Sequence, residues 1–307
     1  GYVLRDARCR LVIATPLAAV KKAVSELNIE CLWTAGDRSH AWQTVLSSGD
    51  ASPLSLPQDE TDLAVFIYTS GTTGKPKGAM LTHRNLTQNV ISVVEAIEAV
   101  GEDVFLCVLP LFHCLAATVT MLVPISLGAE IVLVEQFVPR VVLSAITGQR
   151  VSVLVGVPAM FVVITTSNVS KRAMSNVRAC LSGGAPLPVA VLERFQRMYD
   201  IPIREGYGLS EASPVVAVNV PDAIKPGTVG PPIPGVQVRV VDENDQDVPV
   251  GEAGELLVRG ENVMAGYYGL AEETRHALRG GWLHTGDIAI LDEDGYITIV
   301  DRLKDMI

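Results

Sequence analysis

The feature that most constrains the fold is the alternation of short apolar runs with segments of helical period over the first two thirds of the chain. The apolar runs, which are typical of buried strands, lie at residues 9–14, 63–67, 104–110, 130–134, 151–157 and 177–182. Apolar residues at helical spacing occur in residues 17–27, 86–97, 115–125, 138–146 and 188–199, and Thr82 can cap the second of these helices. Continuous apolar strands separated by helices favour a parallel sheet covered on both faces, so we predict an α/β fold with largely parallel sheets.

The pattern changes near residue 225. Prolines punctuate residues 226–234, and the segment after them alternates with period two, with Val236, Val238 and Val240 on one face. Acidic turn-forming clusters separate the following strands at residues 242–245 and 292–295. We therefore predict two packed α/β subdomains and a small antiparallel β-barrel, at residues 1–98, 99–224 and 225–300.

A glycine-rich stretch, YTSGTTGKPKG, occupies residues 68–78 and follows the apolar run at 63–67. Glycine has no Cβ, so its backbone N–H groups can approach a ligand closely. The hydroxyl side chains, together with Lys75 and Lys77, add further donors and positive charge. Such donors at the end of a strand favour binding of a polyphosphate, although the spacing is not that of the Walker motif.

Composition excludes several classes of function. A formal net charge of −10 argues against nucleic-acid binding, and 49% apolar residues indicate a globular protein. The five cysteines are odd in number and lack metal-ligand spacing, and no signal peptide opens the sequence, so we expect a cytoplasmic protein. The uncharged stretch at 104–129 contains prolines, a histidine and a glycine, which favours a buried helix and strand over a membrane span. Peripheral membrane contact and the oligomeric state stay open.

Four further motifs contain polar residues next to predicted strand ends. Taken singly, each has an ordinary structural interpretation. His113 alone would be a satisfied core histidine, Glu211 a solvated surface acid, and Asp287 with Arg302 a surface ion pair. The motifs are LPLFH at 109–113, SGGAPLP at 182–188, EGYGLSEASP at 205–214, and GWLHTGD at 281–287 followed by DRLKDMI at 301–307.

Together with YTSGTTGKPKG, these motifs resemble those of the adenylate-forming superfamily, which includes acyl-CoA synthetases, beetle luciferases and the adenylation domains of peptide synthetases. The chain is most similar to the medium- and long-chain fatty acyl-CoA synthetases. The resemblance implies an AMP-forming fatty acid–CoA ligase that uses ATP, Mg²⁺ and CoA. In this family a carboxylate attacks the α-phosphate of ATP to give acyl-AMP and pyrophosphate, and the CoA thiol then displaces AMP. Two alternatives remain: an acyl-AMP ligase that loads a carrier protein, and a nucleotide-binding module without turnover.

The resemblance also implies the phosphate and metal contacts. Attack of a carboxylate on ATP joins two anions, so the site must neutralise charge in the transition state. The residues expected around the β- and γ-phosphates are Thr69, Ser70, Gly71, Thr72, Thr73, Gly74 and Lys77. Ser210 would contact the α-phosphate, and Glu211 would hold Mg²⁺, which prefers oxygen ligands. The expected catalytic residues are Thr72, Lys77, His113, Ser210 and Glu211.

The nucleoside and acyl contacts are implied in the same way. Tyr207 would cover one face of adenine, and Asp287 would accept hydrogen bonds from the ribose hydroxyls, with Arg302 beside it. The remaining nucleotide contacts would be Gly184, Ala185, Pro186, Glu205, Gly206 and Gly208. The acyl group would meet His113, Val157, Pro158, Gly183 and Gly208.

Two features refine the expected substrate and boundaries. Amino-acid-activating relatives place an Asp just after the position matched by His113, whereas this chain continues with Cys114, Leu115 and Ala116. We therefore expect an apolar carboxylic acid rather than an amino acid. The resemblance further implies that residues 301–307 are a hinge, centred on Lys304, to a C-terminal domain that is missing. We expect a chain truncated at both ends, with little turnover by itself.

Overall fold

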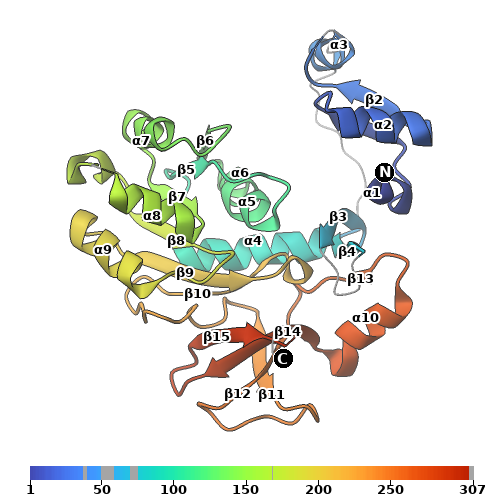
Figure 1. The fold of residues 1–307 in the computed structure, drawn as a ribbon. Helices are drawn as coiled ribbons and strands as arrows, with labels where there is room; N and C mark the ends of the chain where they lie inside the picture. Colours follow the sequence, from blue (N-terminus) through green and yellow to red (C-terminus); the bar gives the residue numbers. More distant parts are fainter. Residues whose placement is uncertain (37–39, 50–58, 70–74, 168, 304–307) are drawn as a thin grey trace. The chain divides into compact units, whose positions relative to one another are not determined.

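The computed structural model describes residues 1–36, 40–49, 59–69, 75–167 and 169–303 (Figure 1). The chain divides into two compact units. The smaller unit comprises Gly1–Asp59 and Tyr68–Gly78, and the larger comprises Glu60–Ile67 and Ala79–Ile307. The subdomain boundaries predicted at residues 98 and 224 stay predictions.

The smaller unit is built around a parallel strand pair. Strand β1 pairs with β2 in a register that runs from Leu11 opposite Glu30 to Ala14 opposite Trp33. The helix between them buries Ala23 and Val24, which confirms the strand and helix predicted at 9–14 and 17–27. The elements of this unit are α1 (Tyr2–Asp6), β1 (Leu11–Ala14), α2 (Ala18–Leu27), β2 (Glu30–Trp33) and α3 (His40–Ser48).

The main sheet of the larger unit has six strands in the order β10-β9-β8-β7-β5-β6. All neighbouring pairs are parallel except β9 with β10, which is antiparallel. The sheet thus confirms the predicted α/β class and its largely parallel pairing. Its strands are β5 (Val104–Cys107), β6 (Glu130–Leu133), β7 (Val153–Gly156), β8 (Ala179–Ser182), β9 (Ile203–Gly208) and β10 (Val215–Val218).

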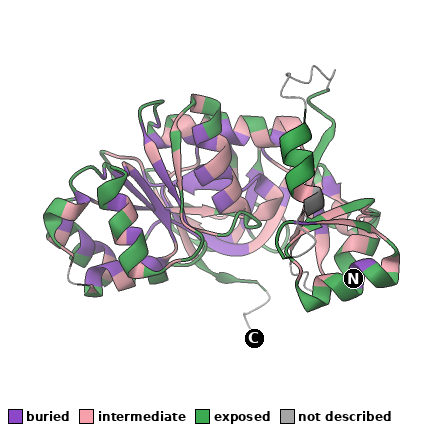
Figure 2. Cartoon of the chain, turned by 90° about the horizontal axis from the view of Figure 1, so that it is seen from above, coloured by how far each residue is buried: buried purple, intermediate pink, exposed green. Residues whose placement is uncertain are grey.

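Helices cover both faces of this sheet and form two hydrophobic cores. Phe105 and Leu106 are neighbours in β5, yet Phe105 packs into one core and Leu106 into the other. Successive strand residues point to opposite faces, so both faces of the central strands are buried. Figure 2 shows the buried residues of the chain in purple. The first core contains residues of α4 (His83–Ile97), the π-helix η1 (Thr118–Leu122) and α6 (Val123–Leu127). The second contains residues of α7 (Pro139–Gly148), α8 (Pro158–Thr166) and α9 (Val189–Tyr199).

Helix α4 begins where the sequence predicts a cap. The Thr82 hydroxyl accepts from the Asn85 amide at 3.2 Å, and the Asn85 side-chain oxygen accepts from the Thr82 amide at 2.8 Å. This reciprocal pair satisfies two donors at the helix N-terminus. The strand before it was not predicted: β4 (Lys77–Thr82) lies between β13 (Gly266–Tyr267) and β3 (Leu63–Thr69) in a three-stranded sheet.

The uncharged stretch at 104–129 forms several short elements. It contains β5, the short helix α5 (Cys114–Ala117), η1 and α6, of which η1 and α6 help to build the first core. The predicted buried strand and helix are therefore confirmed. Within the described residues, no helix is both long enough and apolar enough to cross a membrane.

The C-terminal sheet is antiparallel, as predicted, but it does not close into a barrel. Its order is β11-β12-β14-β15, and no pairing joins β11 to β15 among the described strands. Closure requires the first and last strands to pair. The free edge of β15 instead bonds the linker, where the Val229 amide donates to Ile297 O at 2.8 Å and Ile297 donates to Gly230 O at 3.0 Å. The strands are β11 (Gln237–Val241), β12 (Ala253–Arg259), β14 (Leu283–Leu291) and β15 (Ile297–Arg302).

Candidate active site

The carboxyl ends of the parallel strands bring several motifs to one edge of the main sheet. Gly156 at the end of β7 pairs with Ser182 at the end of β8, and Ser182 pairs with Glu205 in β9. Residues 157–158, 183–188 and 206–214 therefore begin side by side. In open α/β sheets, ligands bind at this edge, outside the carboxyl ends of the strands.

Two glycines at this edge lie at positions that disfavour any other residue. Gly184 has φ +82°, which disfavours other residues, and it begins an exposed shelf of Gly184, Ala185 and Pro186. A Cβ on Gly208 would lie 2.1 Å from the backbone oxygen of Pro214. The glycines therefore keep backbone close to the surface where a flat ligand could lie.

Glu205 supports this shelf from beneath. It is buried, and its Oε1 accepts from the Leu187 amide at 2.8 Å, while burial raises the pKa of its carboxyl group. Gly206 follows it in β9, and a Cβ there would lie 3.0 Å from Ala217 O. Glu205 thus fixes the loop after β8 through a direct hydrogen bond.

Tyr207, Asp287 and Arg302 meet although they lie far apart in the sequence. Asp287 and Arg302 are register partners in β14 and β15, and Arg302 Nε donates to Asp287 Oδ1 at 2.8 Å. The Tyr207 hydroxyl donates to the other carboxylate oxygen. Asp287 is only 3% exposed, so the pair is not an ordinary surface ion pair. Burial, followed by the charge of Asp287, raises the pKa of Tyr207 well above its usual range, so its hydroxyl stays a donor.

Ser210 and Glu211 lie in the 3₁₀ turn η3 (Ser210–Ala212) and contact residues that sequence analysis missed. The Ser210 hydroxyl lies 3.3 Å from the Cys114 sulfur, and the Tyr267 hydroxyl donates to Glu211 Oε1 at 2.9 Å. Burial raises the pKa values of both Cys114 and Tyr267. Glu211 is therefore a partly buried, bonded acid rather than a fully solvated one. No local sequence pattern identifies Tyr267 as a site residue, because its position depends on the pairing of β13 with β4.

His113 is exposed, so the interpretation as a satisfied core histidine is wrong. The His113 ring centroid lies 4.5 Å from that of Phe112, which is 76% exposed. His113 is the N-cap residue of α5, which follows β5 in the chain. On the neighbouring loop, Val157 Cγ1 would lie 3.8 Å from a Cβ on Gly184. A Cβ on Gly183 would lie 3.3 Å from the Leu115 side chain, so this end of the sheet presents apolar groups beside the shelf. Pro158 is buried at the start of α8.

The remaining site residues of the sequence analysis are placed only in part. Thr69 ends β3 and Lys77 begins β4, so the glycine-rich stretch connects two strands. Ser70, Gly71, Thr72, Thr73, Gly74 and the expected hinge residue Lys304 lie outside the described residues.

Glu211, the expected metal ligand, offers chemistry that suits Mg²⁺. Carboxylate oxygens are preferred ligands of this hard cation, and the Ser210 hydroxyl is the neighbouring oxygen in the sequence. Tyr267 orients one oxygen of Glu211 from the side. The Glu211 carboxylate is therefore chemically suited to hold a magnesium ion.

Comparisons with known proteins agree with this arrangement. A model of the AMP-binding enzyme family matches residues 1–268. Feruloyl-CoA synthase of Amycolatopsis sp is 41% identical over 265 residues, which are 85% of this chain and 54% of that protein. The long-chain-fatty-acid–CoA ligase of Bacillus subtilis (strain 168) is 36% identical over 275 residues, which are 87% of this chain and 49% of that enzyme.

Solved structures share the fold. The crystal structure of ATP-bound MatB from Rhodopseudomonas palustris matches with a TM-score of 0.93 and 29% identity, covering 100% of this chain and 61% of that one. The chain spans about half the length of the curated relatives it matches. Both the family model and the relatives agree with the resemblance to adenylate-forming enzymes, and the chain belongs to the AMP-binding enzyme family.

Proposed function

We propose that this chain is the nucleotide- and acyl-binding part of an AMP-forming acid–CoA ligase. Such an enzyme activates a carboxylic acid with ATP to acyl-AMP and pyrophosphate, and then transfers the acyl group to the CoA thiol. The observation that carries the proposal is the buried Asp287, which Tyr207 and Arg302 hold at the edge where the loops after β8 and β9 begin. The curated relatives named above are CoA synthases or ligases, which supports CoA over a carrier protein as acceptor.

The nucleoside would lie between the shelf and Tyr207. Gly184 and Ala185 would meet one face of adenine and the Tyr207 ring the other, with Pro186, Gly206 and Gly208 as further contacts. Asp287 would accept from the ribose hydroxyls, because a buried carboxylate with two donors already in place retains acceptor capacity on each oxygen.

Two sets of residues would neutralise the phosphate charge. Residues 69–74 and Lys77 would supply donors and positive charge to the β- and γ-phosphates, and the Ser210 hydroxyl would donate to the α-phosphate. A magnesium ion, when bound, would offset phosphate charge, and Glu211 is the residue that would hold it. His113 would lie where the attacking carboxylate meets the α-phosphate, so that the two reactants are held together.

The acid would be apolar. No carboxylate follows His113 in the sequence that could pair with a substrate amine, and the partly buried side chains of Val157 and Leu115 lie beside the shelf. A fatty acid of medium or longer chain is our first candidate, as in the Bacillus subtilis relative. An aromatic acid is the second, because the feruloyl-CoA synthase shares 41% identity with this chain. Cytoplasmic location and the hinge role of Lys304 stay predictions.

Acid-dependent exchange of labelled pyrophosphate into ATP would test the substrate. We expect exchange by the full-length protein to rise along the series from acetate to long-chain fatty acids, because each buried methylene contributes about 0.8 kcal/mol to binding. Highest exchange with ferulate would favour the aromatic candidate. A preference for acetate or for an amino acid would contradict both.

A further inference from the structure

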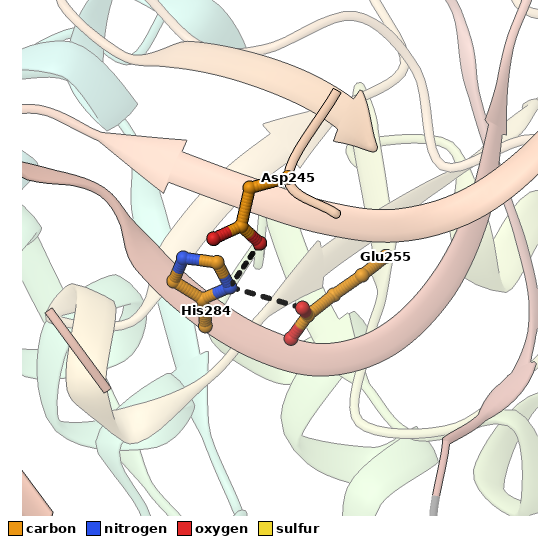
Figure 3. A group of neighbouring side chains, drawn as sticks. All are labelled: Asp245, Glu255 and His284. Carbon is orange, nitrogen blue, oxygen red and sulfur yellow. Dashed lines mark hydrogen bonds and ion pairs between the residues drawn. The ribbon is translucent and has the colours of Figure 1, made fainter. Parts of the chain in front are cut away.

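A cluster of charged side chains lies next to the segment of β14 that carries Asp287. His284 Nδ1 lies 2.9 Å from Glu255 Oε2 and 3.9 Å from Asp245 Oδ1, and Figure 3 shows both carboxylates directed at the imidazole ring. The His284 and Glu255 side chains are only 5% and 14% exposed. Two largely buried titratable groups are costly unless they are paired, so the cluster needs a physical explanation.

A metal ion is one explanation, and the geometry argues against it. Among the described residues, Asp245, Glu255 and His284 form the one group whose candidate ligand atoms lie close enough together, within 4.8 Å. However, Arg279 Nη2 already lies 3.2 Å from Asp245 Oδ1 and 3.5 Å from Glu255 Oε2. The Arg279 hydrogen bond also holds the pKa of Asp245 below its usual range. Because this guanidinium already pairs with both acids, a metal would have to displace it, and we interpret the cluster as an ion-pair network.

The second oxygen of Glu255 points to a different role. Glu255 Oε1 accepts from the backbone amide of Gly286 at 3.1 Å. Glu255 therefore ties the charged cluster to the residue that immediately precedes Asp287. The network of Asp245, Arg279 and His284 fixes one end of the carboxylate while the other end holds the backbone.

Gly286 lies in an irregular part of β14 that needs such support. Leu257 pairs with His284 and Glu255 with Ile288, so three residues of β14 face the single residue Leu256 of β12. Backbone groups in a bulge lose their ladder partners and need others. Here the Thr285 hydroxyl donates to Leu256 O at 2.7 Å and accepts from the Asp287 amide at 3.1 Å, and the Gly286 amide goes to Glu255.

The bulge decides where Asp287 points. Gly286 has φ +70°, a left-handed conformation, and a Cβ added to it would meet nothing within 4 Å. Two hydrogen bonds hold this conformation: the Gly286 carbonyl accepts from the Leu303 amide at 2.9 Å, and the Gly286 amide donates to Glu255 Oε1 at 3.1 Å. The bond to Glu255 is the one that a side-chain substitution can remove. A change at this bond would rotate the peptide that leads directly into Asp287.

We propose that Glu255 is a positioning residue for nucleotide binding: it fixes the bulge at residues 285–287, and so orients the Asp287 carboxylate toward the ribose. The proposal rests on the ribose-binding role of Asp287 proposed above. Glu255 itself need not contact the ligand.

Calorimetry with AMP and with 2′,3′-dideoxy-AMP tests the proposal on this chain. The comparison of the two ligands separates an effect on the orientation of Asp287 from an effect on the stability of the fold. The wild type should prefer AMP by about tenfold, since the dideoxy compound offers no hydroxyls to Asp287. Glu255→Met fills similar volume but cannot accept from Gly286, so it should lose most of this preference while its affinity for the dideoxy compound changes little. Glu255→Gln keeps an acceptor oxygen and should retain the preference. Gly286→Ala, which strains the bulge in open space, should lose it as Met does.

Glu272→Ala is the matched control, because this exposed acid pairs with Arg275 in the helix α10 (Ala271–Ala277), outside the bulge. It should bind both nucleotides as the wild type does. If both Glu255→Met and Gly286→Ala keep the wild-type preference, the positioning role is wrong while ribose binding by Asp287 stands. If either variant weakens both ligands equally, its effect is structural and the positioning role is again wrong. A wild type without any preference would overturn the role of Asp287 and this proposal with it.

Discussion

Replacing Asp287 by Asn tests the nucleotide site at its most buried charge. The Asp287 side chain is 5% exposed, and each of its two oxygens already accepts one hydrogen bond, from Tyr207 and from Arg302. A carboxylate has about four acceptor sites, so roughly two remain for the ribose hydroxyls. Asn replaces one oxygen by a donor and removes the charge from the other.

The expected loss follows from this geometry. An Asn nitrogen that faced Arg302 would set two donors against each other, so the amide should turn its nitrogen toward Tyr207 and lose an acceptor for ribose. Hydrogen bonds to charged groups contribute about 1.5–3 kcal/mol, which corresponds to roughly a ten- to hundredfold weaker affinity for AMP. Calorimetric titration of this chain with AMP measures it directly.

The control for this experiment is Asp294→Asn in the hairpin that joins β14 to β15. Asp294 is 74% exposed and pairs with Lys225, so its substitution should leave AMP affinity unchanged. An Asp287→Asn variant that binds AMP within twofold of the wild type, with the fold intact by circular dichroism, would refute the assignment of Asp287 to the ribose.

Three further predictions concern metal binding, stability and the glycine at the end of β9. Glu211→Gln in the full-length protein should lower Mg²⁺-dependent adenylation by roughly a hundredfold, since metal neutralisation contributes several kcal/mol, and near-normal pyrophosphate exchange would contradict this role. Arg178→Ala leaves the Asp103 carboxylate, 2% exposed, without its cation, and should lower the free energy of unfolding by about 3 kcal/mol at pH 7. Burial raises the pKa of Asp103, but its hydrogen bonds to Arg178 and neighbouring groups lower this pKa overall. The wild type should therefore lose this stabilisation as the pH falls below about 4, as measured by urea titration. The Asp103→Asn variant should not show that loss. Gly208→Ala places a Cβ 2.1 Å from the backbone oxygen of Pro214 and should lower the melting temperature by several degrees. Gly148→Ala, which has open space around it, should not lower the melting temperature. Equal melting temperatures for the two variants would disprove the packing argument.

Local sequence patterns predicted the α/β body well because each pattern is decided within a few residues. The apolar runs at 104–110 and 151–157 became β5 and β7, whose alternate residues fill both cores. Thr82 capped α4 as expected, since capping depends only on the next three residues. These features follow from periodicity and turn chemistry, and no distant contact opposes them.

Long-range pairing could not be predicted in the same way. The strand β4 depends on pairing with its neighbours β3 and β13, the latter through Met80 opposite Gly266. The open C-terminal sheet depends on Val229 and Gly230, which occupy the edge that a barrel would have closed. Helix α10 was missed because it buries no residue and so has no apolar face to detect.

The residues of the candidate site show the same difference between local patterns and long-range contacts. Motifs predicted that Asp287 and Arg302 would lie beside each other, and the structure pairs them at 2.8 Å. The contacts from Cys114 to Ser210 and from Tyr267 to Glu211 needed the fold, because each joins residues from different elements. Glu255 did offer a signal that was not used: it is an acid within the largely apolar strand β12.

The products of ATP turnover test the central claim most directly. The full-length protein, incubated with ATP, Mg²⁺ and a long-chain fatty acid and then analysed by mass spectrometry, should form acyl-AMP and pyrophosphate before CoA is added. Addition of CoA should convert the adenylate to acyl-CoA and AMP. Formation of ADP and phosphate, or of no acyl-adenylate with any carboxylic acid, would contradict the assignment of this chain to an AMP-forming ligase.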